Sequence, residues 1–351
     1  MLALLAIFGA VGAGLIADSL MRSPEAEDDS PPEGEEPAAE DDTSDQSVNL
    51  DWIEDEEAVQ AEARPAGFVD DGMPVSDDIA DPVDAPITAA GNAGDNILNG
   101  GAAGDTLSGG AGHDQLIGRG GADRLAGGSG QDHLHGEEGD DTLLGQGGDD
   151  VLIGGAGNDI LSGGRGADSL AGSEGDDAVS GGGGADTLMG GEGEDTLSGG
   201  MGRDWLVGGS GNDQMIGGGA QDSLDGGAGD DTLWGGAEGG SDAAIDLLNG
   251  GAGNDLIGVG AGDIAMGGDG TDTFQLQDYA PGLPVSEIVD YNPDEDDLVV
   301  VYDPAQHEAP SLTTEAVAGT EDVTLLLDGV AIALIRNAVD LDLSQITLRA
   351  A

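Results

Sequence analysis

The strongest pattern along the chain is a nine-residue alternation of glycine, polar and apolar positions. From residue 91 to residue 234 it repeats without a gap, as in GGAGHDQLI at 109–117 and GGAGNDILS at 154–162. Each unit begins with Gly, carries Asp at its sixth position from Asp105 onward, and has an apolar residue, mostly Leu, at its eighth. An enlarged unit follows at 235–249, and further units continue to Asp272. A fixed short period of this kind predicts a solenoid of stacked coils.

Each unit predicts one turn and one very short strand. The G-G-x-G-x-D half favours a turn, because glycine permits positive φ. The x-Leu-x half supplies three strand residues, of which only the middle one faces inward. Such a strand is not stable alone, so stacked copies must bury a ladder of Leu and pair their backbones. If two units make one coil, residues 18 apart lie above one another, with Asp105 and Asp123 on one edge and Asp114 and Asp132 on the other.

The sequence before the repeats differs sharply in composition. Residues 1–17 have no charged side chain, and their length suits either a short membrane anchor or a signal segment. Residues 18–90 hold many carboxylates against Arg22 and Arg64 and are rich in Pro and Ala. This composition cannot bury enough apolar surface to offset chain entropy, so it predicts a disordered acidic linker.

The sequence after the repeats, residues 273–351, reads as a small β cap. It contains apolar runs at Leu298–Tyr302, Val323–Leu327 and Val330–Ile335. Asp328-Gly329 separates the last two runs and is a strong two-residue hairpin signal. A short final strand is expected near residues 345–348.

Composition excludes several classes of function. The chain has 8 Lys and Arg against 72 acidic residues, a formal net charge of -64, so nucleic-acid binding is not expected. It has no Cys, which excludes disulfides, thiolate metal sites and thiol nucleophiles. Aromatic residues make up 3% of the chain, too few for a large conventional core. A force other than apolar burial must therefore help to hold the coils together.

Stacked carboxylates suggest that this force comes from cations. A column of aspartates at coil spacing is repulsive unless it is neutralised. The glycine turns add backbone carbonyl oxygens, and Ca²⁺ accepts six to eight oxygen ligands in irregular geometry, whereas Mg²⁺ demands a compact octahedron. Zinc and iron prefer His or Cys, which the repeats nearly lack. The residues therefore predict calcium.

The repeated unit resembles the repeats-in-toxin (RTX) calcium-binding nonapeptide, GGxGxDxUx, from residue 91 to residue 272. The resemblance implies an all-β parallel β-roll with Ca²⁺ between successive turns on both edges, on the order of one ion per repeat. It implies that the sixth-position aspartates bind the metal, each with the one 18 residues later. These residues are Asp105, Asp114, Asp123, Asp132, Asp141, Asp150, Asp159, Asp168, Asp177, Asp186, Asp195, Asp204, Asp213, Asp222, Asp231, Asp246, Asp255 and Asp272.

The resemblance also implies a cellular setting. Members of the family are often exported unfolded through a one-step type I channel, guided by a C-terminal signal, and fold on meeting extracellular calcium. The expected location is therefore extracellular, with residues 1–17 as a tether if they are retained. The apolar N-terminus departs from the family pattern and leaves the export route open. Partners are expected to be calcium and a cell-surface or matrix component, with a membrane reached only through the N-terminal segment.

The alternatives to a calcium-binding repeat protein are an enzyme and an unliganded structural chain. No G-x-S-x-G elbow or H-E-x-x-H motif occurs, so no enzymatic activity is expected; the alternative is a secreted hydrolase or polysaccharide-modifying enzyme carrying the repeats. A third possibility is an unliganded glycine-rich structural chain. His133 and His135 flank a core Leu and are expected to point outward together. They are interpreted as ordinary surface residues; the alternative is a zinc pair, for which the sequence offers no evident third ligand. Trp205 and Trp234 are expected to be isolated and exposed.

A few units depart from the consensus in ways that predict weaker sites. They are Asn96 in place of Asp, Arg119 at a second position, and Ala103 and Ala220 in place of the fourth-position Gly. Neighbouring coils are expected to compensate for these weaker sites.

Overall fold

The computed structural model describes residues 85–236, 244–277, 280–338 and 341–351. The apolar segment 1–17 and the linker as far as residue 84 lie outside the described residues, so the expectations about them stay predictions. Within the described residues every regular element is a β-strand. The predicted all-β, parallel β-roll is confirmed.

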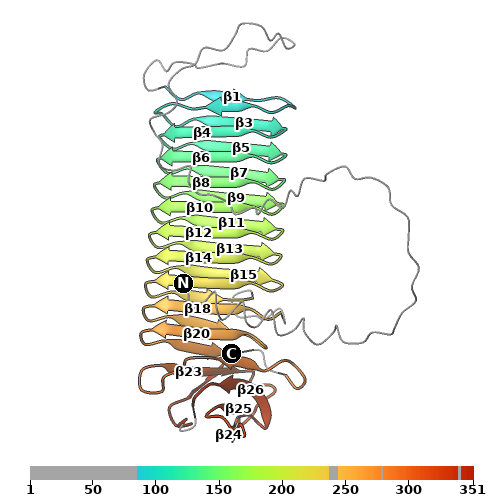
Figure 1. The fold of residues 1–351 in the computed structure, drawn as a ribbon, viewed down its shortest axis with the longest axis vertical. Helices are drawn as coiled ribbons and strands as arrows, with labels where there is room; N and C mark the ends of the chain where they lie inside the picture. The colour runs from blue at the N-terminus through green and yellow to red at the C-terminus, as the bar shows by residue number, and fades with distance from the viewer. Residues whose placement is uncertain (1–84, 237–243, 278–279, 339–340) are drawn as a thin grey trace, which may run out of the picture. The chain divides into compact units, whose positions relative to one another are not determined.

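The strands alternate between two sheets, so that each coil contributes one strand to each (Figure 1). Sheet A contains, in spatial order, β1 (Thr88–Ala90), β3 (Thr106–Ala111), β5 (Arg124–Ser129), β7 (Thr142–Gly147), β9 (Ile160–Arg165), β11 (Ala178–Gly183), β13 (Thr196–Met201), β15 (Gln214–Gly219), β17 (Thr232–Trp234), β19 (Leu256–Val259), β21 (Thr273–Leu276), β23 (Asp297–Tyr302) and β27 (Thr347–Ala350).

Sheet B faces sheet A across the core. It contains β2 (Ile97–Asn99), β4 (Gln115–Gly120), β6 (His133–Glu138), β8 (Val151–Ala156), β10 (Ser169–Glu174), β12 (Thr187–Glu192), β14 (Trp205–Ser210), β16 (Ser223–Ala228), β18 (Leu247–Ala252), β20 (Ile264–Asp269), β22 (Ser286–Ile288), β26 (Val330–Ile335), β25 (Val323–Leu327) and β24 (Leu312–Ala316). All pairings are parallel except β24 with β25 and β25 with β26.

The predicted coil of 18 residues is present through the regular region. Leu170 of β10, for example, pairs with Leu188 of β12. The insertion before β18 lengthens the offset to 24 residues, as in Ser223 with Leu247, and the next coil shortens it to 17, as in Leu247 with Ile264. Strand pairing continues on both sides of the insertion, because β18 pairs with β16 before it and with β20 after it.

Through the repeats, the core is a single column of eighth-position side chains from both sheets. Leu116, Leu143 and Leu188 are fully buried, and the same column continues as Met215 and Ile257. Each coil thus buries only two apolar side chains. A stack of this kind gains its apolar burial cooperatively, coil upon coil.

The strands are longer than predicted. The expected three-residue strand is six residues long in most units, as in Thr187–Glu192, because it continues through the first, second and third positions of the next unit. At most second positions glycine favours this path, because the backbone there has positive φ. A Cβ on Gly191 at a second position would collide with the carbonyl oxygen of Ser173, one coil earlier.

Several second-position residues adopt the glycine conformation without being glycine. Arg119, Glu137, Gln146 and Ser173 have φ between 77° and 95°. Left-handed backbone costs an L-residue about 1 kcal/mol or more. These coils therefore store backbone strain that their glycine-bearing neighbours do not.

We expect Gln146→Gly to stabilise the calcium-bound roll by about 1 kcal/mol, less the extra entropy that glycine gives the unfolded chain. Gln146 is exposed, so little packing is lost. Urea unfolding in saturating calcium measures the change. The matched control is Gln131→Gly, an exposed Gln outside the positive-φ set, for which the free energy of unfolding should stay the same or fall. Equal responses of the two variants would contradict the strain argument.

The sequence boundaries of the roll do not coincide with breaks in the sheets. Thr88–Ala90, placed in the linker from composition, form β1 and pair with β3. At the other end β21, β23 and β27 extend sheet A, and β22 and β26 extend sheet B. The predicted Asp328-Gly329 hairpin joins β25 to β26, with positive φ at both turn residues.

The expectation that Trp234 is exposed is wrong. Its side chain is only 9% exposed, whereas Trp205 is 49% exposed as expected. The Trp234 ring lies over Gly258 of the next strand in sheet A, where a Cβ would overlap the ring. The nine-residue pattern places Trp234 outward, but the absence of a side chain at Gly258 lets the ring lie against the sheet.

Candidate metal sites

The sixth-position aspartates form two rows, one along each edge of the roll. We call the turns that follow odd-numbered strands the Asp114 edge and those that follow even-numbered strands the Asp123 edge. The Asp114 edge contains Asp114, Asp132, Asp150, Asp168, Asp186, Asp204, Asp222 and Asp246. The Asp123 edge contains Asp105, Asp123, Asp141, Asp159, Asp177, Asp195, Asp213, Asp231, Asp255 and Asp272. Every one of them is at most 3% exposed.

One oxygen of each carboxylate holds the preceding coil. The backbone N–H of Asp159 donates to Oδ1 of Asp177 at 2.7 Å, and that of Asp177 donates to Oδ1 of Asp195 at 2.8 Å. The same bond recurs on the Asp114 edge, where Asp150 donates to Asp168 at 2.9 Å. Each aspartate therefore contacts its row partner in both directions. The backbone oxygen is also used, because the N–H of Ala178 donates to the carbonyl of Asp159.

The other oxygen, Oδ2, is buried without a hydrogen-bond partner in most of the row. This holds for Asp114, Asp123, Asp132, Asp141, Asp150, Asp159, Asp168, Asp177, Asp186, Asp195, Asp204, Asp213, Asp231 and Asp255. The first-position Gly of the same turn faces this atom; a Cβ on Gly172 would overlap Oδ2 of Asp177. A buried unpaired carboxylate oxygen costs several kcal/mol, so a long series of them indicates a missing cationic partner.

The turns fit calcium. The first-position Gly beside each Oδ2 also faces a glycine carbonyl of the next coil: at Gly172 these atoms are Oδ2 of Asp177 and the carbonyl oxygen of Gly190. No three His, Asp or Glu side chains converge on one point within the described residues. Each ion would therefore be held by two row carboxylates, such as Asp159 and Asp177, together with turn carbonyls. An all-oxygen set with few charged ligands suits Ca²⁺.

Without metal, burial changes the acidity of the rows. Loss of hydration raises the pKa of Asp141, Asp177 and Asp231 to about 7, and the charges of the neighbouring row carboxylates add to the rise. The backbone N–H bonds described above oppose it. On the other edge the same causes raise the pKa of Asp150 to about 7. Near pH 7 the metal-free carboxylates are therefore partly protonated and partly ionised. A bound divalent cation would favour the ionised form.

The rows extend beyond the predicted residues. The N–H of Asp246 donates to Oδ1 of Asp263 at 3.0 Å, and that of Asp272 donates to Oδ1 of Asp296 at 3.0 Å. The metal ligands predicted from the sequence include neither Asp263 nor Asp296. The sequence does contain a signal for Asp263. It follows Gly-Ala-Gly, as in a turn of the repeat, but comes eight residues after Asp255 instead of nine.

A second, exposed ladder runs beside the buried one on the Asp123 edge, at the fifth position of the unit. Oδ1 of Asp140 accepts the N–H of Asn158, and Oδ1 of Asp176 accepts the N–H of Glu194 at 2.9 Å. Asp230 and Asn254 continue it. The consensus leaves this position open, so sequence reasoning missed the ladder. These exposed side chains accept backbone N–H groups of the next coil, in addition to the bonds made by the buried row.

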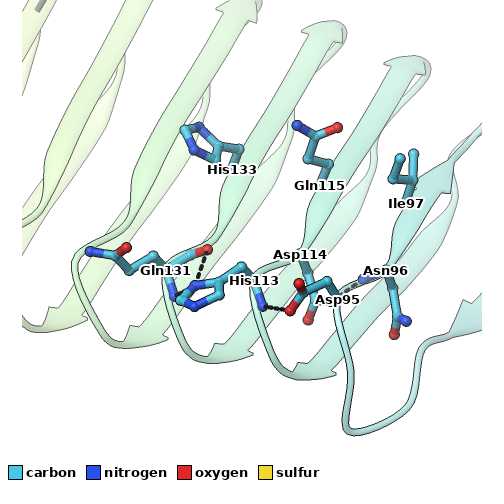
Figure 2. A pocket seen from close by; sticks show the side chains of 8 residues that line it. All are labelled: Asp95, Asn96, Ile97, His113, Asp114, Gln115, Gln131 and His133. Atoms are coloured by element: carbon cyan, nitrogen blue, oxygen red, sulfur yellow. Dashed lines mark hydrogen bonds between the residues drawn. The ribbon is translucent and has the colours of Figure 1, made fainter.

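A surface hollow of about 430 Å³ lies at the N-terminal end of the Asp114 edge (Figure 2). Turn residues Asp95, His113 and Gln131 line one side, and outward strand residues including His133 line the other. The N–H of His113 donates to Oδ1 of Asp95 at 2.8 Å, and Nδ1 of His113 accepts the N–H of Gln131 at 2.9 Å. These bonds use Oδ1 of Asp95 and Nδ1 of His113 within the turns. The zinc hypothesis for His133 and His135 likewise gains no third ligand within the described residues.

No helix in the described ranges is long and apolar enough to cross a membrane. Comparison with curated proteins found no match. Comparison with family models found the RTX calcium-binding nonapeptide repeat in overlapping copies over residues 90–125, 117–152, 144–179, 153–188, 180–215, 207–238 and 241–263. These segments coincide with the coils that carry the two aspartate rows. Through residues 90–263 the chain therefore belongs to the RTX calcium-binding nonapeptide repeat family.

Proposed function

We propose that this calcium-binding repeat protein works outside the cell, where calcium binding folds its roll, and that it has a structural, adhesive or interaction role. The observation that carries the proposal is the pair of buried aspartate rows with unpaired Oδ2 atoms. Such rows oppose stacking when they are bare and bridge coils when they hold a divalent cation. Folding is then linked to the calcium concentration of the compartment.

The extracellular setting follows from the concentrations involved. Extracellular calcium modules have dissociation constants of roughly 0.1–1 mM, and the cytosol is far poorer in calcium. The acid-rich chain should remain expanded there. The proposal includes export guided by residues 273–351, with residues 1–17 as a signal or tether. Accessibility of the protein to protease added to intact cells that make it would test this location.

A calcium titration of the full chain tests the central claim. At neutral pH in EDTA we expect a far-ultraviolet circular dichroism spectrum without β structure, and a cooperative gain of β signal at millimolar calcium. Magnesium at the same concentration is the control and should not reproduce the transition. An ordered sheet in EDTA at neutral pH would contradict the proposal. The proposal assigns no catalysis to the chain, so turnover of alginate-like polymers or esters by the purified protein would also count against it.

A further inference from the structure

The two edges of the roll differ in their outward side chains. The third and fifth positions of each unit point away from the buried rows. On the Asp123 edge from β10 to β13 they are acidic and exposed: Glu174, Asp176, Glu192 and Glu194. On the Asp114 edge from β9 to β15 none of them is acidic: Arg165, Ala167, Gly183, Ala185, Met201, Arg203, Gly219 and Gln221. Two sides of the same coils therefore carry opposite charge.

The acid-free stretch forms one continuous patch, which we call the Arg–Met–Trp patch: Arg165, Met201, Arg203 and Trp205. Arg165 and Met201 both pair with Gly183 in sheet A, and the Met201 methyl group lies over Gly183. Met201 is 74% exposed and Trp205 is 49% exposed. Arg203 donates from Nη2 to the side-chain oxygen of Gln221 at 3.1 Å, which holds it on the edge.

The composition of this patch is that of a protein interface. Arg, Met and Trp are enriched at the centres of interfaces, and Trp and Arg are the commonest residues whose loss abolishes binding. Exposure of their apolar surface to water is unfavourable in the monomer, and burial at an interface would remove that free-energy cost. At these coils, among the described residues, the Asp123 edge presents the exposed row of carboxylates that matches the patch in charge.

We propose that the Arg–Met–Trp patch binds the Asp123 edge of a second copy of this chain, at Glu174, Asp176, Glu192 and Glu194. Along the roll Arg165 precedes Glu174 and Arg203 follows Glu194, so in side-by-side copies with a common rung spacing of about 4.8 Å the two arginines flank the four acids in height. The contact is head-to-tail, because different surfaces meet. Repeated, it yields a row of parallel rolls rather than a closed dimer.

Calcium makes this association possible. The buried rows carry most of the charge of the roll, and bound ions would neutralise them, which leaves the outward side chains to decide how two copies interact. The remaining attraction acts between exposed charges and is screened within a few ångströms at about 1 M salt. Association should therefore need calcium and be weakened by salt.

Sedimentation velocity of the full chain in saturating calcium tests the proposal, with a non-ionic detergent throughout to suppress contacts through residues 1–17. We expect a sedimentation coefficient that rises with protein concentration at about 0.05 M salt and returns to the monomer value at about 1 M. Arg165→Glu with Arg203→Glu should abolish the rise. The matched control, Arg119→Glu with Arg124→Glu, makes the same charge change in the first coils and should leave it intact.

A charge swap makes the test specific. Glu192→Arg with Glu194→Arg should also give monomers. Mixing this variant with the Arg165/Arg203 variant should restore assembly, because the unchanged acidic edge of one variant then meets the unchanged patch of the other, and the two reversed surfaces also match in charge. Circular dichroism of every sample separates folding from association. A roll that folds with calcium but never associates overturns the association proposal and leaves the proposed calcium-dependent folding intact. Wild-type protein that stays monomeric at both salt concentrations overturns the proposal. A charge-reversed variant that assembles like the wild type also overturns it. Binding of another ligand to the patch would not change either conclusion.

Discussion

Protein freed of calcium should fold its roll at about pH 5 and lose it on going to about pH 7.5. In the folded state burial raises the pKa of Asp141, Asp150 and Asp177 to about 7, while a carboxyl in the unfolded chain titrates near its ordinary value of about 4. The folded roll therefore binds protons more tightly than the unfolded chain. This stability is complete below the unfolded pKa and is lost as the pH rises through the folded pKa values.

The transition should be centred between about pH 6 and pH 7, because the pKa values of Asp123, Asp186 and Asp213 are raised to about 6 by the same burial. Calcium inverts the dependence. Protons and the metal compete for the same Oδ2 atoms, so a calcium-loaded roll should release its ions as the pH falls through this range.

Circular dichroism of dilute, calcium-free protein at stepped pH measures this. Samples are centrifuged before measurement, because the isoelectric point near 4.1 favours precipitation at lower pH. The control is about 1 M NaCl at about pH 7.5, which screens general repulsion without protonating the rows. If salt alone folds the chain, net charge rather than the titration of buried carboxylates opposes folding. A spectrum without β structure at about pH 5 would also refute the prediction.

Asp177→Asn should weaken calcium binding while stabilising the metal-free roll. The amide keeps an oxygen that can accept the N–H of Asp159, so the coil contact survives. It removes a buried charge that Asp159 and Asp195 repel. It also removes a ligand shared by the sites above and below it. Because calcium affinity depends strongly on ligand charge, those two sites should weaken by roughly tenfold or more.

Asp176→Asn is the matched control for this variant. Asp176 lies on the same edge, is exposed, and offers Oδ1 to the N–H of Glu194, which an amide oxygen can replace. It loses the same unit of charge without touching the buried row. Isothermal titration calorimetry should find about two fewer tight ions in Asp177→Asn and an unchanged number in Asp176→Asn. An equal loss of bound calcium ions in the two variants would show that calcium binding depends only on the net charge of the chain.

Much of the roll could be predicted because its contacts repeat. The nine-residue period places Leu188 inward and Asp186 in a turn, and a coil of two units brings Asp186 over Asp204 without knowledge of any other contact. Periodicity made each residue's environment the same as that of its neighbours in the row. The rows were therefore predicted wherever the period was kept, and Asp263, where one residue is deleted, was missed. That the row residues bind calcium stays a prediction.

The C-terminal residues show the opposite case. Val330–Ile335 was recognised as a strand of a hairpin, but not as the strand that pairs with β22 and extends sheet B. Arg336 holds it there, donating from Nε to Glu287 at 2.7 Å and from Nη1 to Asp322 at 2.9 Å. These partners are 49 and 14 residues away, and no local pattern joins them.

By itself the sequence determined the coil, the inward Leu column, the two aspartate rows and the choice of an oxygen-binding dication, because each depends only on residue type and period. The tertiary structure alone decided which carboxylate oxygen is bonded and which is left unpaired, how far the strands extend, and why Trp234 is buried beside Gly258. Those features depend on how coils contact one another in space, which side-chain chemistry along a single unit does not specify.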